Sequence, residues 1–346
     1  MKRKIACLLA VLLLSGCGGK PIVPREREFY AMDTQMRLTA FGGEAEEAVR
    51  ETEEAICSLE ARLSRTDGKS PIARLNAQPE EAVELDEESL ALLEAARYWS
   101  EETEGAFDPS IAPLADAWGF TGEHQQLPER EALETALSHV GMEHVHVDAS
   151  AGTVRLDRGS GLDLGGIAKG YASDVAANIY ASHGAFGGLA YLGGNVLAWG
   201  EKEDGSPWRV GVQDPSPQGE NQSFVGVLQL KNAFAITSGG YQRYFEENGQ
   251  RYHHILDPQT GYPARSGLLS VTVVAEGIPG KGTMCDALST ALFVMGEERA
   301  LDFWRERRED FQLILVTENG RVLVTEGLAE AFAPQEGSGY IYETVA

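Results

Sequence analysis

The order of the predicted helices and strands restricts the fold of this chain more than any other feature of its sequence. Three segments with helical hydrophobic periodicity, 44–63, 86–104 and 128–141, lie in the N-terminal part, whereas strand-like segments dominate from residue 189 onward. This order differs from the regular strand–helix alternation of parallel βαβ units. We therefore predict an α+β fold with mixed, largely antiparallel sheets and flanking helices.

Individual elements can be assigned from the same patterns. One long strand is predicted over 28–41, and a helix is predicted from Gly166 to about residue 182. Segments 64–85 and 106–127 have the composition of loops. The other predicted strands cover 144–148, 153–157, 189–199, 208–212, 224–230, 232–237 and 268–275; two helices cover 283–296 and 297–309; a closing hairpin covers 311–317 and 320–325.

The first residues have the pattern of an export signal. Three basic residues precede the apolar segment 5–14, which is too short to cross a bilayer as a helix. The sequence Leu-Ser-Gly-Cys at 14–17 resembles a bacterial lipobox, in which the cysteine is lipidated and becomes the new N-terminus. A plain secretory signal, cut at a small residue, is the alternative.

The preferred interpretation divides the chain into three parts. Residues 1–16 form a lipoprotein signal peptide, residues 17–27 form a tether with a lipid on Cys17, and residues 28–346 form one domain. The protein is then an exported lipoprotein anchored at the periplasmic or another extracytoplasmic face of a membrane. Two further cysteines, Cys57 and Cys285, are too few for a disulfide framework and are predicted to be lone buried thiols, with a single disulfide between them as the alternative.

The charge of the chain restricts its ligands. The formal net charge is −24, and it becomes −27 without residues 1–16, which hold three basic residues and no acidic one. A phosphate backbone would be repelled, so nucleic acid is not an expected partner. An anionic small molecule would need a metal ion or a local cluster of Lys and Arg.

Two segments could supply these features. Segment 163–170 (DLGGIAKG) lies between a predicted strand and a helix, where glycines and free N–H groups favour an anion and Lys169 adds a positive charge. An ordinary glycine-rich turn is the alternative. Asp286 and Thr290 are four residues apart on a predicted helix, so their oxygens share a face and suit Mg²⁺ or Ca²⁺. Here the alternative is an aspartate that caps the start of its own helix.

Two more segments carry groups that could serve catalysis or binding. Segment 253–263 (HHILDPQTGYP) places two histidines before a turn, and a histidine can act as a base near neutral pH. Segment 235–241 (AITSGGY) offers the hydroxyls of Thr237 and Ser238 to a polar ligand. Histidines at a strand end and a simple hairpin turn are the respective alternatives.

Taken in order, the motifs resemble those of the ApbE family of flavin transferases over roughly residues 28–317. Each fragment is short, but chance rarely places so many in the same order. The matching fragments are AMDT (31–34), GAFDP (105–109), LADAWG (114–119), DLGGIAKG (163–170), LGGN (192–195), GVQDP (211–215), TSG (237–239), HILDPQTG (254–261) and DALST (286–290).

The resemblance implies a specific reaction. Members bind FAD with Mg²⁺, cleave its pyrophosphate, attach FMN through a phosphoester to a Thr or Ser of an exported protein, and release AMP. Their acceptors include subunits of NADH:quinone reductases and Rnf-type complexes. Some members instead act as FAD pyrophosphatases that give FMN and AMP, and a flavin-binding lipoprotein without catalysis is a further alternative.

The resemblance also assigns residues. Asp286, Thr290 and the backbone of Gly166 match metal ligands, and His254 matches the histidine that we expect to act as the base, so His254 and Asp286 are the predicted catalytic residues. Thr237 and Ser238 are included in the predicted FAD site. The positions that match flavin contacts are Met32, Ala106, Phe107, Asp108, Asp163, Lys169 and Leu256.

Three positions depart from the family pattern. Relatives often have glycine in place of Asp33, an aromatic residue in place of Thr66 and a carboxylate in place of Ser289. Acceptor sequences of the family resemble Asp-x-x-Ser/Thr-Gly/Ala-Ala-Thr. Segment 286–292 of this chain is similar but ends in Leu292, which has no hydroxyl, so we expect the acceptor to be another protein.

Overall fold

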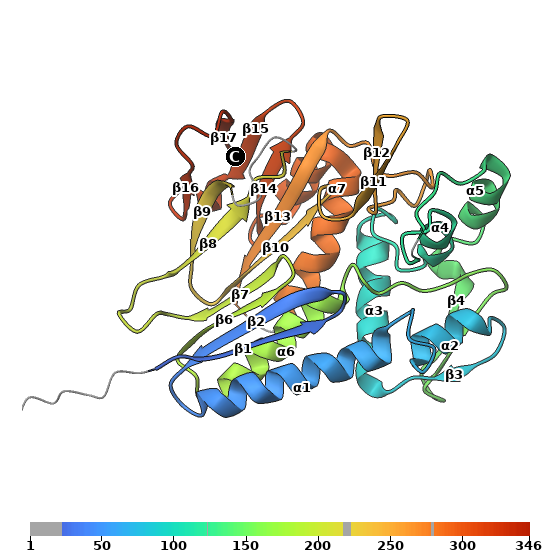
Figure 1. Cartoon of the computed structure of the whole chain (residues 1–346), viewed down its shortest axis with the longest axis horizontal. Coiled ribbons are helices and arrows are strands. Elements are labelled where there is room, and N and C mark those ends of the chain that lie inside the picture. The colour runs from blue at the N-terminus through green and yellow to red at the C-terminus, as the bar shows by residue number, and fades with distance from the viewer. Residues whose placement is uncertain (1–22, 123, 217–222, 278–279) are drawn as a thin grey trace, which may run out of the picture.

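A single large sheet runs through the molecule (Figure 1). The computed structural model describes residues 23–122, 124–216, 223–277 and 280–346, so the predicted signal peptide, Cys17 and most of the tether lie outside the described residues. Neighbouring strands in the sheet are antiparallel except the last pair. In spatial order its nine strands are β1 (Arg25–Ala31), β2 (Thr34–Phe41), β6 (Gly187–Leu192), β7 (Asn195–Gly200), β10 (Ala233–Gly239), β13 (Leu268–Glu276), β14 (Gln312–Thr317), β15 (Arg321–Thr325) and β17 (Ile341–Val345).

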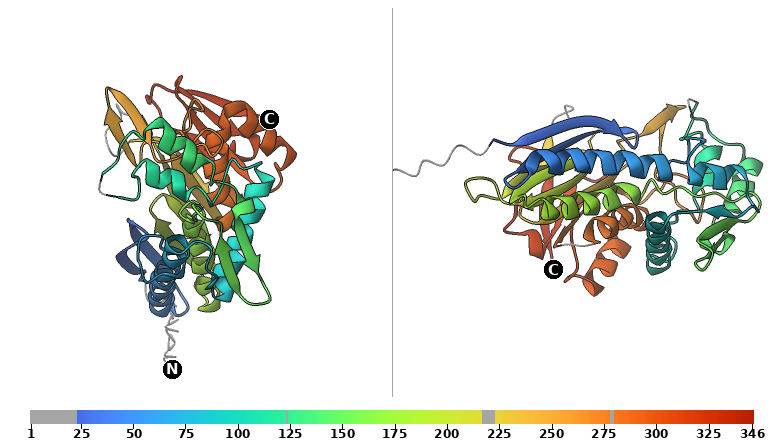
Figure 2. Two further views of the ribbon diagram at one scale, coloured as in Figure 1. Left: turned by 90° about the vertical axis from the view of Figure 1, so that its right-hand side faces the viewer. Right: turned by 90° about the horizontal axis from the view of Figure 1, so that it is seen from below.

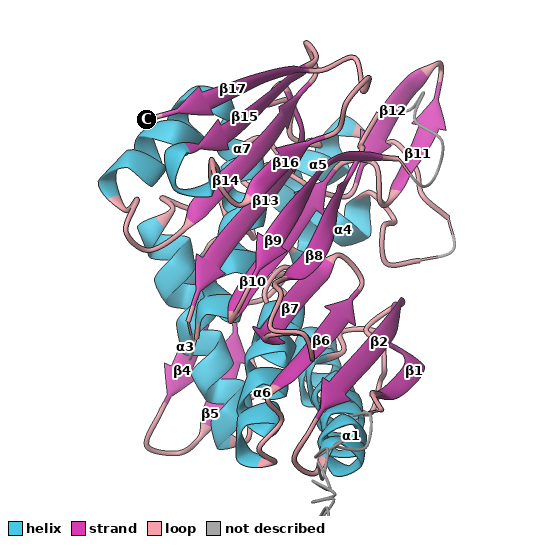
Figure 3. Ribbon diagram, turned by 90° about the vertical axis from the view of Figure 1, so that its left-hand side faces the viewer, coloured by secondary structure: helices cyan, strands magenta, loops and turns pink. Residues whose placement is uncertain are grey.

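The two faces of this sheet are covered differently (Figure 3). Three helices, α1 (Ala45–Leu63), α6 (Ala168–Ser182) and α7 (Lys281–Glu306), pack on one face and form the main hydrophobic core with it. On the other face lies a small sheet of β8 (Trp208–Gln213), β9 (Phe224–Leu230) and β16 (Phe332–Pro334). A second core of aliphatic and aromatic side chains fills the space between the two sheets.

The remaining elements gather mainly at one end of the molecule, to the right in Figure 1 and in the right-hand view of Figure 2. A hairpin of β11 (Tyr244–Glu247) and β12 (Gln250–His253) packs against them through a cluster of aromatic rings around Trp118. The other elements are α2 (Pro71–Ala77), α3 (Glu87–Glu102), α4 (Ala112–Ala117), α5 (Arg130–Leu137), the three-stranded sheet of β3 (Val83–Glu84), β5 (Thr153–Leu156) and β4 (Val145–Asp148), and the short 3-10 helices Met142–His144 and Glu326–Leu328.

Helices α6 and α7 cap each other. The N-cap positions of both helices, Ile167 and Gly280, make no side-chain hydrogen bond to their own first turn. Instead, Asp174 of α6 accepts hydrogen bonds from the backbone N–H of Gly282 (2.9 Å) and of Thr283 (2.8 Å) at the start of α7. In return, Asp286 of α7 accepts a hydrogen bond of 2.7 Å from the N–H of Gly170 in the first turn of α6. Both carboxylates thereby satisfy helix N–H groups that have no intrahelical partner.

This exchange requires close approach of the two backbones. A Cβ at Gly170 would lie 2.3 Å from the carbonyl oxygen of Gly282, and a Cβ at Gly282 would lie 2.5 Å from that of Gly170. Any larger residue at these positions would push the helices apart. The two glycines therefore let the carboxylates reach their partners.

The structure confirms the predicted α+β class and most of the predicted elements. The segment 28–41 is two strands rather than one, because Met32 and Asp33 form a turn with φ angles of 48° and 58°. Segment 189–199 is likewise a hairpin, and the two helices predicted over 283–309 form one helix kinked at Gly296. Both loop segments, 64–85 and 106–127, contain short helices.

Two further expectations are corrected. The hairpin of β14 and β15 does not close the sheet, because β17 pairs with β15 in parallel. Both Cys57 and Cys285 are free thiols as predicted, but Cys57 is exposed and only Cys285 is buried. Among the described residues, no helix combines the length and the apolar character needed to cross a membrane.

Candidate active site

A cleft of about 990 Å³ is lined by the first residues of α6, by Asp286 and Thr290 of α7 and by the end of β10. Its size is at the upper end of the range for small-molecule sites. All predicted binding and catalytic residues of the domain line this cleft, although they come from six separate parts of the chain. They are Met32, Ala106, Phe107, Asp108, Asp163, Gly166, Lys169, Thr237, Ser238, His254, Leu256, Asp286 and Thr290.

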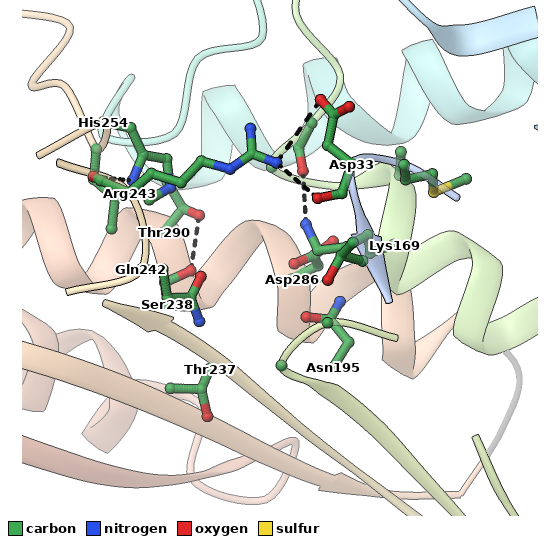
Figure 4. Close-up of a pocket in the computed structure, with 18 of the residues that line it drawn as sticks. Asp33, Lys169, Asn195, Thr237, Ser238, Gln242, Arg243, His254, Asp286 and Thr290 are labelled. Carbon is green, nitrogen blue, oxygen red and sulfur yellow. Dashed lines mark hydrogen bonds and ion pairs between the residues drawn. The ribbon is translucent and has the colours of Figure 1, made fainter. Parts of the chain in front are cut away.

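The predicted metal ligands Asp286, Thr290 and Gly166 all line the cleft, and Figure 4 shows the side chains of the first two. Asp286 is only 4 % exposed, and its Oδ2 accepts the hydrogen bond from Gly170, while no described residue donates a hydrogen bond to Oδ1. Thr290 is one turn further along α7, and a Cβ at Gly166 would lie 3.7 Å from its Oγ1. A carboxylate, a hydroxyl and a backbone carbonyl can thus converge, and all are hard oxygen donors suited to Mg²⁺.

This arrangement corrects one alternative from the sequence. Asp286 lies in the second turn of α7 rather than at its start, so it caps α6 and not its own helix. The position at which relatives often carry a carboxylate, Ser289, is fully buried, and its hydroxyl contacts Ser238 Oγ at 2.8 Å and the Asp286 carbonyl at 2.9 Å. Within the described ranges, no group of three or more His, Cys, Asp or Glu side chains could hold a metal.

The glycine-rich loop before α6 is stabilised by a hydrogen bond to the carboxylate of Asp163, which belongs to the same loop. Asp163 Oδ1 accepts a hydrogen bond of 2.8 Å from the N–H of Gly165, and Arg65 makes ion pairs of 3.2 Å to Asp163 and 2.8 Å to Asp116. Lys169 differs from Arg65, because within the described part of the chain its Nζ donates a hydrogen bond only to the carbonyl of Gly165, at 3.2 Å. Its positive charge is therefore available to an anion in the cleft.

A compact wall faces this loop. Phe107 is 4 % exposed, and its ring would lie 3.2 Å from a Cβ at Gly166, so a larger residue at 166 would make a tight contact with the ring. Asp108 Oδ1 accepts hydrogen bonds from the N–H (2.8 Å) and Oγ (2.6 Å) of Ser110, while burial raises the pKa of Asp108. Met32 also lines the cleft, and its N–H donates a hydrogen bond of 2.8 Å to Glu60 Oε1.

His254 is oriented by one backbone carbonyl. Its backbone N–H and its ring Nδ1 both lie 3.1 Å from the carbonyl oxygen of Arg243. Since a carbonyl only accepts, Nδ1 carries the proton and Nε2 is the basic nitrogen. Burial lowers the pKa of His254 to about 4, and the positive charges of Arg243 and Lys169 act in the same direction. The imidazole is therefore neutral at physiological pH.

Asn195 and Arg243 are two of the lining residues that the sequence did not single out. Asn195, at the start of β7, is 1 % exposed, and its donor Nδ2 has no hydrogen-bond partner among the described residues. A buried amide without a partner is costly, so a polar ligand group is the natural acceptor. The LGGN fragment contained this residue but gave no sign of burial. Arg243 precedes β11 and lies outside all the motifs described above, but its side chain extends across the cleft (Figure 4).

Comparison with known proteins agrees with the geometry. Residues 32–315 match the model of the ApbE family. The chain belongs to the ApbE family. An FAD:protein FMN transferase from Treponema pallidum is 33 % identical over 324 residues, which are 88 % of each chain. The protein of the same name from Haemophilus influenzae is 31 % identical over 341 residues, covering 93 % of this chain and 96 % of the relative.

Solved structures give the same result. An ApbE protein from Thermotoga maritima superimposes with a TM-score of 0.82 at 37 % identity, covering 89 % of this chain and 99 % of that one. The apo flavinyl transferase ApbE of Pseudomonas stutzeri gives a TM-score of 0.77 at 28 % identity, with coverages of 91 % and 98 %. The predicted family, fold class and transferase function are thereby confirmed. The roles of single residues, the magnesium and the acceptor stay predictions.

The double role of Asp286 leads to a stability prediction. Asp286→Ala removes the acceptor for the buried N–H of Gly170, which should cost about 1–3 kcal/mol of unfolding free energy. Asp286→Asn can still present an amide oxygen to that N–H and should lose less. Urea unfolding of both variants measures the difference, and equal losses would show that the hydrogen bond to α6 contributes nothing.

Proposed function

We propose that this cleft binds FAD together with Mg²⁺ and transfers FMN to a Thr or Ser hydroxyl of an exported acceptor protein, with release of AMP. The observation that carries the proposal is that Asp286, Thr290, Gly166 and Lys169 line one cleft of about 990 Å³, in which a Cβ at Gly166 would lie 3.7 Å from Thr290 Oγ1. The net charge of the chain is −24, so it repels a polyanionic ligand unless a metal ion in the cleft neutralises part of the charge of that ligand.

The proposed metal site consists of three oxygen donors from residues that line the cleft. Asp286 Oδ1, Thr290 Oγ1 and the Gly166 carbonyl would hold Mg²⁺ and leave positions for phosphate oxygens, as is usual for this ion. Bound there, the ion would supply charge neutralisation and polarisation of the phosphoryl group. Meanwhile, the buried hydrogen bond from Gly170 keeps the Asp286 carboxylate in one orientation.

The rest of the cleft would bind and orient FAD. Lys169 supplies a positive charge for the pyrophosphate, and the unpaired Nδ2 of Asn195 supplies a donor for a polar group of the ligand. Met32, Ala106, Phe107, Asp108 and Leu256 are proposed to contact the flavin. Thr66, at the position where relatives often carry an aromatic ring, also lines the cleft, so any ring stacking must come from other side chains.

The transfer step balances with the groups present. The acceptor hydroxyl oxygen would attack the phosphorus of the FMN half, and the bond from that phosphorus to the bridging oxygen would break, so that AMP leaves. The proton of the hydroxyl would pass to Nε2 of His254. Although a histidine with a pKa of about 4 is a weak base, the negative charges of bound FAD favour the imidazolium and raise that pKa.

Hydrolysis of FAD to FMN and AMP by the same groups is the second candidate, because the two reactions differ only in the nucleophile. The acceptor is proposed to be a different protein, such as an exported subunit of an NADH:quinone reductase or Rnf-type complex. Within this chain, the acceptor-like segment 286–292 lies in α7, and Leu292 at its end is fully buried.

Metal dependence gives the first functional test. Asp286→Asn should reduce FMN transfer by about 100-fold or more, and EDTA should abolish transfer by the unaltered protein, because both remove the metal site. The matched control is Asp302→Asn, which changes an exposed aspartate of the same helix. Transfer is read as flavin fluorescence on a denaturing gel after incubation with FAD, Mg²⁺ and an acceptor carrying the family motif.

The outcomes separate the alternatives. Undiminished transfer by Asp286→Asn would overturn the metal assignment. Rapid accumulation of FMN and AMP without any acceptor protein would favour hydrolysis over transfer, and FAD binding without metal-dependent turnover would favour a protein that only binds flavin.

The base assignment predicts a pH profile. For the unaltered protein, kcat/KM should decrease only as the pH falls toward about 4, because kcat/KM reports the pKa of His254 in the enzyme without FAD. The decrease in kcat should begin at a higher pH, because kcat reports His254 in the complex, where bound FAD raises its pKa. His254→Gln should lower kcat by about 100-fold or more and remove the kcat limb. Exposed His124 serves as the control as His124→Gln, and identical profiles for the two variants would exclude His254 as the base.

We also propose that Cys17 carries a lipid anchor, on the basis of the lipobox-like sequence at 14–17. Cys17→Ala should leave the protein unlabelled by radioactive palmitate and shift it from the membrane to the soluble fraction after expression in a bacterial host. Palmitate labelling that persists in Cys17→Ala would refute the anchor at this residue.

A further inference from the structure

Arg243 is placed to do more than orient His254. From its position before β11 its side chain extends across the mouth of the cleft to the turn between β1 and β2 (Figure 4). There, its Nη2 lies 3.3 Å from the backbone carbonyl oxygen of Asp33 and 3.8 Å from Asp33 Oδ2. A cation thus crosses the entrance to a site that is proposed to receive an anion.

The partner of Arg243 belongs to a fixed turn. Met32 and Asp33 both have positive φ angles, and the N–H of Met32 is held by Glu60 of α1 at 2.8 Å. The turn therefore fixes the backbone of Asp33. At this position relatives often have glycine, which carries no charge.

The bond between the two side chains is nevertheless loose. The side chain of Arg243 is 52 % exposed and that of Asp33 is 71 % exposed, and the ion pair is 3.8 Å long. Pairs of this kind contribute little to stability, because water competes for both charges. A ligand with a better acceptor could replace Asp33 at small cost.

Of the two arginines that line the cleft within the described residues, Arg243 has the weaker ion pair. Among the described lining residues, the Lys and Arg side chains are Arg65, Lys169 and Arg243. Arg65 is 11 % exposed and holds two carboxylates at 2.8 and 3.2 Å, so its charge is already neutralised. Arginine binds phosphate through two parallel N–H···O bonds, which are stronger than a loose pair with an exposed carboxylate.

We propose that Arg243 is a phosphate-binding residue, which Asp33 holds across the cleft mouth until the pyrophosphate of FAD takes its place. This inference rests on the proposed function, since it requires FAD as the ligand. The exchange involves only the side chain of Arg243, so its carbonyl continues to hold His254 through both hydrogen bonds. One residue then binds the substrate and orients the base.

The exchange predicts opposite effects of two substitutions. Arg243→Gln removes the phosphate contact and should raise the Kd for FAD about tenfold, whereas Asp33→Asn removes the competing carboxylate and should lower it about twofold to threefold. Asparagine tolerates the positive φ of Asp33, so the turn is kept. Arg243→Lys keeps the charge without the planar fork and should fall between the unaltered protein and Arg243→Gln.

The experiment is isothermal titration of full-length protein with FAD in the presence of Mg²⁺ and without acceptor, with chromatography to verify that FAD stays intact. Riboflavin, which has the same ring system but no phosphate, is titrated in parallel, and its Kd should not change in any variant. Arg251→Gln is the matched control, because Arg251 lies on the adjacent hairpin and pairs with Glu246 outside the cleft. Thermal unfolding of each variant verifies that it is folded.

Three results would overturn the proposal. If Arg243→Gln and Asp33→Asn both weaken FAD binding, the pair merely ties the two rims of the cleft together. If Arg243→Gln weakens riboflavin and FAD equally, the arginine does not contact phosphate. If Arg243→Gln binds FAD as the unaltered protein does, the inference fails while the proposed function stands; the proposed function itself fails if the unaltered protein neither binds FAD nor transfers FMN.

Discussion

The reciprocal capping of α6 and α7 is the interaction on which the rest of the structure depends. Each helix lacks a side-chain cap of its own and receives one from the other, through Asp174 in one direction and Asp286 in the other. Glycines at 170 and 282 bring the backbones close enough for this exchange. Because Asp286 is both cap and proposed metal ligand, the bond that joins the two helices also sets the position of the metal site.

Around this point, the cleft concentrates the few positive charges that an acidic chain can offer. Arg65 is neutralised by its two carboxylates and supports the glycine-rich loop, while Lys169 and Arg243 keep their charges available. The same two cations help to keep His254 neutral, since they disfavour the imidazolium. The negative charge of a bound dinucleotide would instead favour the imidazolium and raise the pKa of His254. Substrate binding would therefore make His254 a stronger base.

Periodicity in the sequence predicted the longer helices and most strands, and the resemblance of the ordered motifs to a known family predicted thirteen of the residues that line the cleft. What they missed depends on contacts between distant parts of the chain. The turn at Met32 and Asp33 contains neither glycine nor proline and is held by Glu60 of α1. Likewise, the burial of Asp286 becomes visible only when α6 packs against it, and Arg243 reaches the cleft only after the chain has folded.

The parallel strand β17 has a consequence for how the chain completes its fold. It contains Ile341–Val345, five of the last six residues, and it covers the open side of β15, whose residues Val322–Val324 are buried. Until β17 pairs with it, the backbone of β15 has an unpaired edge that could pair with a strand of another chain. The sheet can therefore be completed only when β17 has paired with β15, and loss of β17 would expose an aggregation-prone edge even with the cleft intact.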